Sequence, residues 1–266
     1  MTMLLDPRVA DLAPAPCAPR HTAQPALVAQ PALTSQPALV AISHGTSSPV
    51  GQRAVASLVA AVAGARGDLT VSGGFVDVQQ PDVEATLDSL DHAVPAVVVP
   101  LLLSAGYHVH VDLRDELAVA PRPTALAAAL GPDDRLVAVL HRRLLEAGLK
   151  SDDGVVLACA GSSDARAVAD CHDMGARLSR ALGRTVRVGF ISAARPRLAD
   201  AVELERESSA RVVVSTYLLA PGYFTDLAHA TTADAATAPL LAAGESPPAE
   251  LVELVVDRYR AGSSGF

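Results

Sequence analysis

The sequence has few aromatic residues and no long apolar run. Aromatic side chains make up 3% of its 266 residues, and tryptophan is absent. Base-stacking surfaces and aromatic cages depend on such rings, so neither kind of site is expected. No segment has the roughly 20 consecutive apolar residues of a membrane-spanning helix, and the N-terminus lacks the apolar core of a secretory signal. The sequence therefore predicts a soluble, cytoplasmic protein.

Cysteine and positive charge are also scarce. Cys17, Cys159 and Cys171 are odd in number and lack the spacing of a metal cluster or a disulfide framework. We expect Cys159 to be a small buried residue at a strand end. The formal net charge of -8 argues against nucleic acid and anionic membranes as partners, because both require a basic surface. An anionic small molecule stays compatible, since a few arginines in one cleft can outweigh the global charge.

Proline and alanine are frequent in residues 1–37. The tetrapeptide Gln-Pro-Ala-Leu occurs at 24–27, 30–33 and 36–39. Proline at every sixth residue interrupts any helix and removes hydrogen-bond donors from a sheet. This segment is expected to be a flexible leader.

Two separate stretches of the chain are repeated. Residues 39–48 reappear at 155–163, and residues 102–108 reappear at 218–224, both at an offset of 116 residues. A shared offset at two places indicates a duplicated domain. We expect two similar domains facing each other across a cleft.

Short apolar runs alternate with amphipathic stretches from Leu39 onward, which is typical of α/β folds with parallel sheets. Each half is expected to be a doubly wound parallel-sheet domain, the first at 38–150 and the second at 155–260. The expected strands are 39–43, 70–76, 96–103, 155–158, 186–191 and 211–219. Ser48 and Pro49 predict a helix start, Gly183 predicts a helix end, and a helix at 136–145 is expected to close the first domain.

Three side chains that can bind a metal follow the strands of the first half, namely His44, Asp77 and His108, with His110 as a fourth candidate. Ligands of parallel α/β sheets bind at the carboxyl ends of the strands. Two imidazoles and a carboxylate suit a divalent cation such as Fe²⁺ or Co²⁺. Gly45 and Gly106 keep the backbone small where a bulky ligand would approach.

Only the first half keeps these groups. Ala160 replaces His44 and Phe224 replaces His108 in the second half. Ser192 stands opposite Asp77 after a one-residue shift. The first half is therefore the predicted catalytic half.

The order and spacing of three motifs point to a known family. They are Ser43-His44-Gly45-Thr46-Ser47, then Gly74-Phe75-Val76-Asp77 with Pro81, then the run from Val98 through Ser104-Ala105-Gly106-Tyr107-His108 to Leu113. Together they resemble the sirohydrochlorin chelatase family of class II, ATP-independent tetrapyrrole chelatases. The resemblance extends over about residues 38 to 260, which is nearly everything outside the leader.

This resemblance implies insertion of Fe²⁺ or Co²⁺ into sirohydrochlorin, for siroheme or cobalamin biosynthesis, with iron as the first choice. His44 and His108 would bind the metal and handle protons. Asp77 stands where the family often has glutamate, and its shorter side chain has less reach. No cofactor is implied beyond the substrate metal, and one two-domain chain can form its cleft as a monomer.

Sirohydrochlorin carries eight carboxylates, so the resemblance also implies cations at the cleft. Arg53 on the first helix and Arg114 after the His108 segment are candidates for substrate binding. Arg195 or Arg197 could contribute from the second half.

Two other functions are compatible with parts of the pattern. A metal or tetrapyrrole carrier could have the same fold without catalysis. Ser43-His44-Gly45 is also similar to the Arg-His-Gly motif of histidine phosphatases, although Ser43 stands where that motif has its phosphate-binding arginine.

The asymmetry between the halves predicts the outcome of exchanging their residues. His108→Phe should abolish metal insertion, because it removes one of the two imidazoles. Phe224→His should create no second working site, because Ala160 and Ser192 remain. Steady-state rates of metal insertion measure both effects; a working His108→Phe variant would contradict the assignment.

Overall fold

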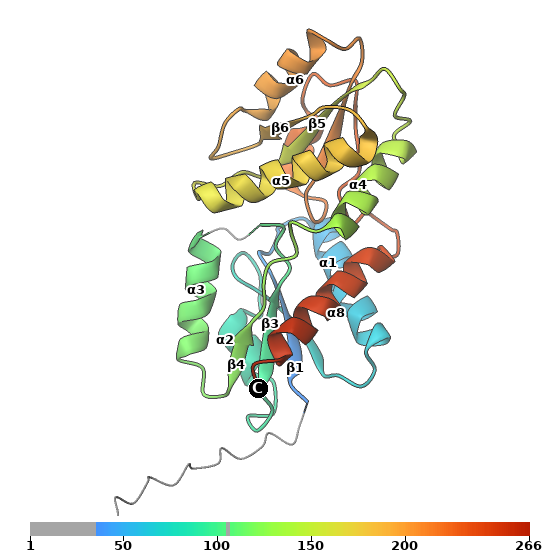
Figure 1. The fold of residues 1–266 in the computed structure, drawn as a ribbon. Coiled ribbons are helices and arrows are strands. Elements are labelled where there is room, and N and C mark those ends of the chain that lie inside the picture. The colour runs from blue at the N-terminus through green and yellow to red at the C-terminus, as the bar shows by residue number, and fades with distance from the viewer. Residues whose placement is uncertain (1–35, 105–106) are drawn as a thin grey trace, which may run out of the picture. The chain divides into compact units, whose positions relative to one another are not determined.

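The chain forms two four-stranded parallel sheets. The computed structural model describes residues 36–104 and 107–266, and of residues 107–112 it describes the backbone alone. The predicted leader lies almost wholly outside these residues. The first sheet has the order β2-β1-β3-β4 and the second the order β6-β5-β7-β8 (Figure 1). The strands are β1 Ala38–Ser43, β2 Val71–Phe75, β3 Ala96–Pro100, β4 Thr124–Leu126, β5 Gly154–Cys159, β6 Val186–Phe190, β7 Val212–Tyr217 and β8 Ala235–Ala236.

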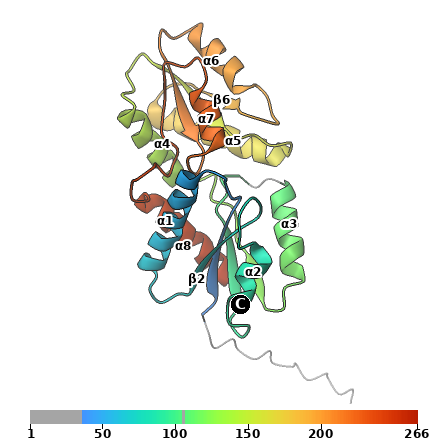
Figure 2. The same ribbon diagram turned by 180° about the vertical axis from the view of Figure 1, so that it is seen from behind.

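Helices cover both faces of the first sheet. In both ribbon views α1 and α8 lie on one side of it, and α2 and α3 lie on the other (Figures 1 and 2). The helices are α1 Pro49–Ala65, α2 Val83–Asp88, α3 Tyr107–Ala118, α4 Asp134–Glu146, α5 Ala165–Leu182, α6 Leu198–Arg206, α7 Tyr223–His229 and α8 Ala249–Ser263. None of the helices in the described ranges is both long and apolar enough to cross a membrane. The duplicated, doubly wound α/β architecture predicted from the sequence is confirmed.

The local signals in the sequence account for several element ends. Ser48 caps α1 through its hydroxyl, which accepts a hydrogen bond from the Gly51 N–H, and Pro49 begins the helix. Gly183 ends α5 with a positive φ of 64°. The predicted strand at 96–103 instead ends at Pro100, whose missing N–H removes one possible bond, although the Leu101 N–H still donates to the Ile42 carbonyl oxygen at 2.7 Å.

The two halves repeat even their irregular backbone. Gly45 and Gly161 follow the first strand of each half, and both have a φ of 93°. A Cβ at Gly45 would collide with the carbonyl oxygen of Asp77, and one at Gly161 would collide with that of Ser192. Each half therefore needs glycine here for the same two reasons, an unusual φ and a close backbone approach.

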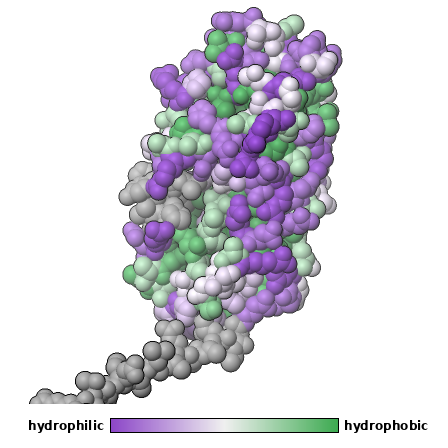
Figure 3. Space-filling model, viewed as in Figure 1, coloured by the Kyte–Doolittle hydropathy of each residue, from purple (hydrophilic) through white to green (hydrophobic). Residues whose placement is uncertain are grey.

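Helices α4 and α8 join the two halves. Helix α4 packs against α5 and β7 of the second half, whereas α8, at the chain's end, packs against α1, β3 and β4 of the first. We expected a helix at 136–145 to close the first domain; the helix is present as α4, but it packs against the second half. Hydrophilic side chains prevail over α4 and α8 on the face seen in Figure 3, as expected for amphipathic helices with their apolar side inward.

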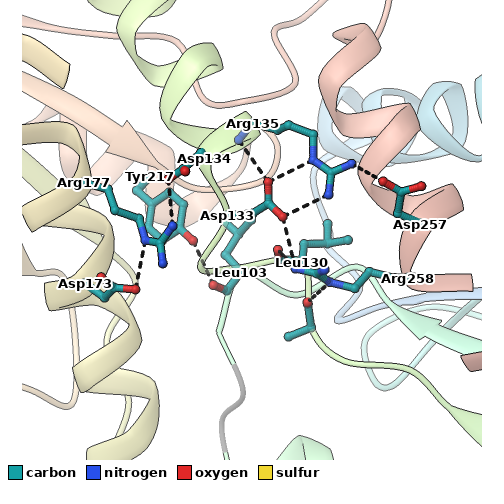
Figure 4. A network of polar contacts seen from close by, with 11 residues as sticks. Leu103, Leu130, Asp133, Asp134, Arg135, Asp173, Arg177, Tyr217, Asp257 and Arg258 are labelled. Atoms are coloured by element: carbon teal, nitrogen blue, oxygen red, sulfur yellow. Dashed lines mark hydrogen bonds and ion pairs between the residues drawn. The ribbon is translucent and has the colours of Figure 1, made fainter. Parts of the chain in front are cut away.

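A polar network ties α4 to α8 (Figure 4). Asp133 caps α4 and accepts hydrogen bonds from Arg135 at 2.9 Å and from Arg258 of α8 at 3.4 Å. Arg135 also donates to Asp257 of α8 at 2.6 Å. Burial of Asp133 opposes its ionisation, but the hydrogen bonds from Arg135 outweigh burial and lower the carboxyl pKa below its usual value. The two helices are thus fixed to each other by ion pairs as well as by apolar contact.

Because α4 packs against the second half and α8 against the first, the structure predicts one cooperative unfolding transition. Leu254→Ala removes a fully buried side chain of α8 and should lower the free energy of unfolding by about 2–5 kcal/mol. Denaturant unfolding should still show a single transition, shifted as a whole. Leu145→Ala, at an exposed position of α4, is the control and should change little. Two separate transitions, only one of them shifted, would contradict a shared core.

The backbone at Gly45 predicts a second stability effect. Gly45→Ala combines a positive φ with a collision against Asp77, and it should destabilise the fold by about 1–3 kcal/mol. Gly64 lies in α1 with no atom near its potential Cβ, so Gly64→Ala should stabilise by about 0.5–1 kcal/mol. Thermal unfolding measures both, and equal effects at the two positions would refute the argument.

Candidate functional site

His44 lies at the carboxyl end of the central strand of the first sheet. It directly follows β1, and its side chain is exposed. Its carbonyl oxygen accepts a hydrogen bond from the Asp77 N–H at 3.1 Å, which joins the loop after β1 to the loop after β2. The neighbouring Ser43 hydroxyl is buried and has no hydrogen-bond partner among the described residues. The exposed imidazole is therefore held on a well-anchored backbone.

The loop that follows His44 is fixed from two sides. The Thr46 N–H donates to Oε1 of Gln79 at 2.9 Å, and Nε2 of Gln52 donates to the Thr46 carbonyl oxygen at 2.8 Å. The Thr46 hydroxyl accepts from the Ser48 N–H at 3.1 Å. The sequence analysis missed Gln79, because no local pattern shows that a residue after β2 contacts the loop after β1.

A cavity of about 560 Å³ lies between the carboxyl ends of the two sheets. His44, Thr46 and Gln79 line it from the first half, and Tyr217, Tyr223 and Phe224 line it from the second. Leucine, alanine, glycine and proline residues from both halves make up much of the remaining wall. Of the described residues that line this cavity, none is arginine, lysine, aspartate or glutamate, and His44 supplies the imidazole. As far as the described residues show, the site is thus a largely apolar pocket with the His44 imidazole at its edge.

Asp77, one of the predicted metal ligands, does not line the cavity that contains His44. The backbone N–H of Asp77 bonds to the carbonyl oxygen of His44. The Asp77 carboxylate, however, accepts a hydrogen bond from the Val78 N–H at 2.7 Å. It lines a separate hollow of about 770 Å³ together with acidic residues of α2 and with Glu116 of α3. His108 and His110 lie in the first turn of α3, and their side chains are outside the described part, as is Gly106 altogether. Within the part of the chain that is described, no cluster of three or more histidine, cysteine or acidic side chains could hold a metal.

The predicted arginines lie away from the cavity wall. Arg53 is exposed on α1, and Arg114 is exposed on α3. Arg195 is 3.9 Å from Asp200, and Arg197 donates to the Ile191 carbonyl oxygen at 3.4 Å. None of the four lines the cavity that contains His44.

The wall from the second half contains two buried thiols. Cys159 and Cys171 are free cysteines, and both line the cavity. Burial raises the pKa of the Cys159 thiol, and a hydrogen bond with Cys159 lowers the pKa of Cys171. The expectation that Cys159 is buried at a strand end is confirmed. Sequence reasoning gave no role to Cys171, because its distance from Cys159 along the chain hides their contact.

Tyr217 connects the second half to the segment that leads to His108. Its hydroxyl donates a hydrogen bond to the Leu103 carbonyl oxygen at 2.9 Å (Figure 4). Burial raises the pKa of this hydroxyl well above its usual value, so it remains a donor. A residue of the half that lacks counterparts of His44 and His108 thus holds the backbone shortly before α3. The sequence carried no signal of this contact between the halves.

Comparison with known proteins indicates the family of this chain. The family model described as CbiX matches residues 38–147 and 154–260. No curated protein matches the sequence significantly.

Solved structures share the fold at low sequence identity. SirB from Bacillus subtilis with Fe³⁺ is 18% identical and has a TM-score of 0.69, with 87% of this chain and 97% of that chain covered. SirB from Bacillus subtilis subspecies spizizenii in complex with cobalt is 15% identical and has a TM-score of 0.62, with the same coverage. CbiX, described as the terminal enzyme for biosynthesis of siroheme in denitrifying bacteria, is 18% identical with a TM-score of 0.60, covering 84% and 98%.

The two family matches fall on the two halves that the sequence repeats predicted. The first includes His44 and the segment of His108, and the second includes Ala160 and Phe224. The resemblance predicted from the motifs is thereby confirmed at the level of the family. Since the family model covers most of the chain, this protein belongs to the CbiX family.

Proposed function

We propose that this protein inserts a divalent metal ion, Fe²⁺ or Co²⁺, into sirohydrochlorin. The observation that carries the proposal is the apolar cavity between the two sheets, with His44 at its edge. An apolar pocket with one basic group suits a large conjugated ring whose central nitrogens must lose protons. Membership of the CbiX family and the likeness to structures described as sirohydrochlorin chelatases support the same substrate.

The chemistry requires a proton acceptor. Two pyrrolic N–H groups lose their protons as the metal enters the ring, and a neutral imidazole, whose ordinary pKa is about 6.5, accepts a proton readily near neutral pH. We assign this role, and metal delivery, to His44 and His108. Asp77 is the third candidate ligand; one oxygen of its carboxylate accepts the Val78 N–H, and the other oxygen would be the one to bind a metal.

The two halves would divide the work. In this proposal residues 38–150 form the catalytic domain and residues 155–260 form the opposite wall of the cavity. One chain supplies both walls, so the protein would act as a monomer.

The choice of metal is the finer part of the proposal. Both Fe²⁺ and Co²⁺ bind imidazole ligands. We favour Fe²⁺, because one structural relative is described as an enzyme of siroheme biosynthesis and another was solved with Fe³⁺. Competition between the two ions at equal free concentration, with insertion followed by absorbance, would distinguish them.

Metal insertion by His44 variants tests the function. We expect His44→Ala to lower kcat by about 10²–10⁴-fold, the usual contribution of a general base, in anaerobic assays that follow the absorbance of sirohydrochlorin. His172→Ala is the matched control, because this exposed histidine of α5 does not line the cavity, and it should retain the wild-type rate. If the wild type binds sirohydrochlorin and metal but inserts no faster than the uncatalysed reaction, the protein is a carrier and the proposal fails.

A further inference from the structure

Two neighbouring aromatic side chains stand exposed at the edge of the cavity. Tyr223 and Phe224 begin α7 and keep 70% and 40% of their surface accessible. The chain has only four tyrosines and four phenylalanines. Tyr223 and Phe224 both line the cavity that contains His44. Exposing large aromatic surface costs free energy, so two such rings side by side on one cavity call for a ligand that covers them.

The two rings form one unit. Their centroids are 5.9 Å apart with an angle of 73° between the ring planes, the edge-to-face arrangement that aromatic pairs favour. Each ring therefore steadies its neighbour while an outer surface of both stays accessible. A pair held in this way loses little side-chain freedom when it binds a flat ligand.

The start of α7 also lies against the loop of His44. A Cβ at Gly222, the residue before Tyr223, would be 3.1 Å from the Thr46 hydroxyl. A Cβ at Gly51 would collide with the carbonyl oxygen of Pro221. The aromatic pair and the His44 loop thus approach each other across the same cavity, from the two halves of the chain.

We propose that Tyr223 and Phe224 form the binding surface for one face of the tetrapyrrole ring. This inference rests on the proposed function. The described lining residues carry no arginine or lysine, so the cavity can hold the flat conjugated ring but offers carboxylates only neutral hydroxyl and amide donors besides His44. The carboxylates of the ligand would remain at the rim and in solvent. Because the two ring planes are 73° apart, one ring can lie face to face with a flat conjugated ring while the other meets the same ring with its edge.

The position has a counterpart in the first half. Tyr223 and Phe224 occupy the positions that Tyr107 and His108 occupy in the first copy, at the shared offset of 116 residues. Replacement of the imidazole by a phenyl ring removes a metal-binding group and adds an apolar face. On this proposal, Phe224 of the second half binds the substrate at the position where His108 of the first half takes part in the chemistry.

Equilibrium binding of metal-free sirohydrochlorin tests the proposal. We expect Phe224→Ala and Tyr223→Ala each to raise Kd about tenfold, as loss of a face or edge contact with an aromatic ring does, in titration calorimetry with no metal present. Phe224→Tyr keeps the ring and should bind like the wild type, whereas Phe224→Leu keeps apolar volume without the flat face and should bind more weakly. In turnover assays the loss should fall on KM more than on kcat.

Leu227→Ala is the matched control. Leu227 lies one turn further along α7 and is 37% exposed, but it does not line the cavity, so its removal should leave Kd unchanged. Thermal unfolding of each variant checks that the fold is retained. If the wild type inserts metal and the alanine variants bind sirohydrochlorin as tightly as it does, the aromatic surface is refuted while the proposed function stands. If the wild type binds no sirohydrochlorin at all, the proposed function itself fails.

Discussion

The packing of α4 and α8 between the two halves is the interaction on which the rest of the structure depends. Apolar residues from both halves form one continuous cluster, which runs from Leu39 of β1 to Tyr259 of α8. The Tyr259 hydroxyl, in addition, donates a hydrogen bond to the Pro37 carbonyl oxygen at 2.6 Å, next to the start of β1. Because the core is shared, the packing of each half stabilises the other half. The carboxyl ends of both sheets consequently keep their places around the cavity.

Duplication preserved the scaffold more strictly than the chemistry. Gly45 and Gly161 share one backbone conformation, and Val78 and Ala193 share another, with φ of 65° and 51°. A close backbone approach constrains the two glycines, and all four positions have a positive φ that most residues disfavour. His44 and Ala160 follow the same strand of their halves without any such constraint on the side chain. One half could therefore lose its imidazole while the geometry around it stayed the same.

The uncharged cavity gives a physical account of how an acidic protein could bind an anionic ring. The net charge is -8, and the described lining residues offer no basic side chain other than His44. Binding through a conjugated face relies on apolar contact, which the global charge does not weaken. Arginines such as Arg53 and Arg114 would then act, if at all, on groups outside the cavity.

The sequence by itself predicted most of the elements, their duplication and the half that keeps His44 and His108. Ser48, Pro49 and Gly183 predict helix ends correctly because caps act over a few residues. Apolar runs predict the long central strands because every residue of these strands is buried. The short strands β4 and β8 were not predicted, because two or three residues are too few to show an apolar run or an alternating pattern. Only the tertiary structure decided which sheet α4 and α8 cover, that Gln79 fixes the His44 loop, and that the Asp77 carboxylate bonds to its own loop. Each of these depends on contact between surfaces distant along the chain, and local patterns of polarity and propensity do not say which surfaces will meet.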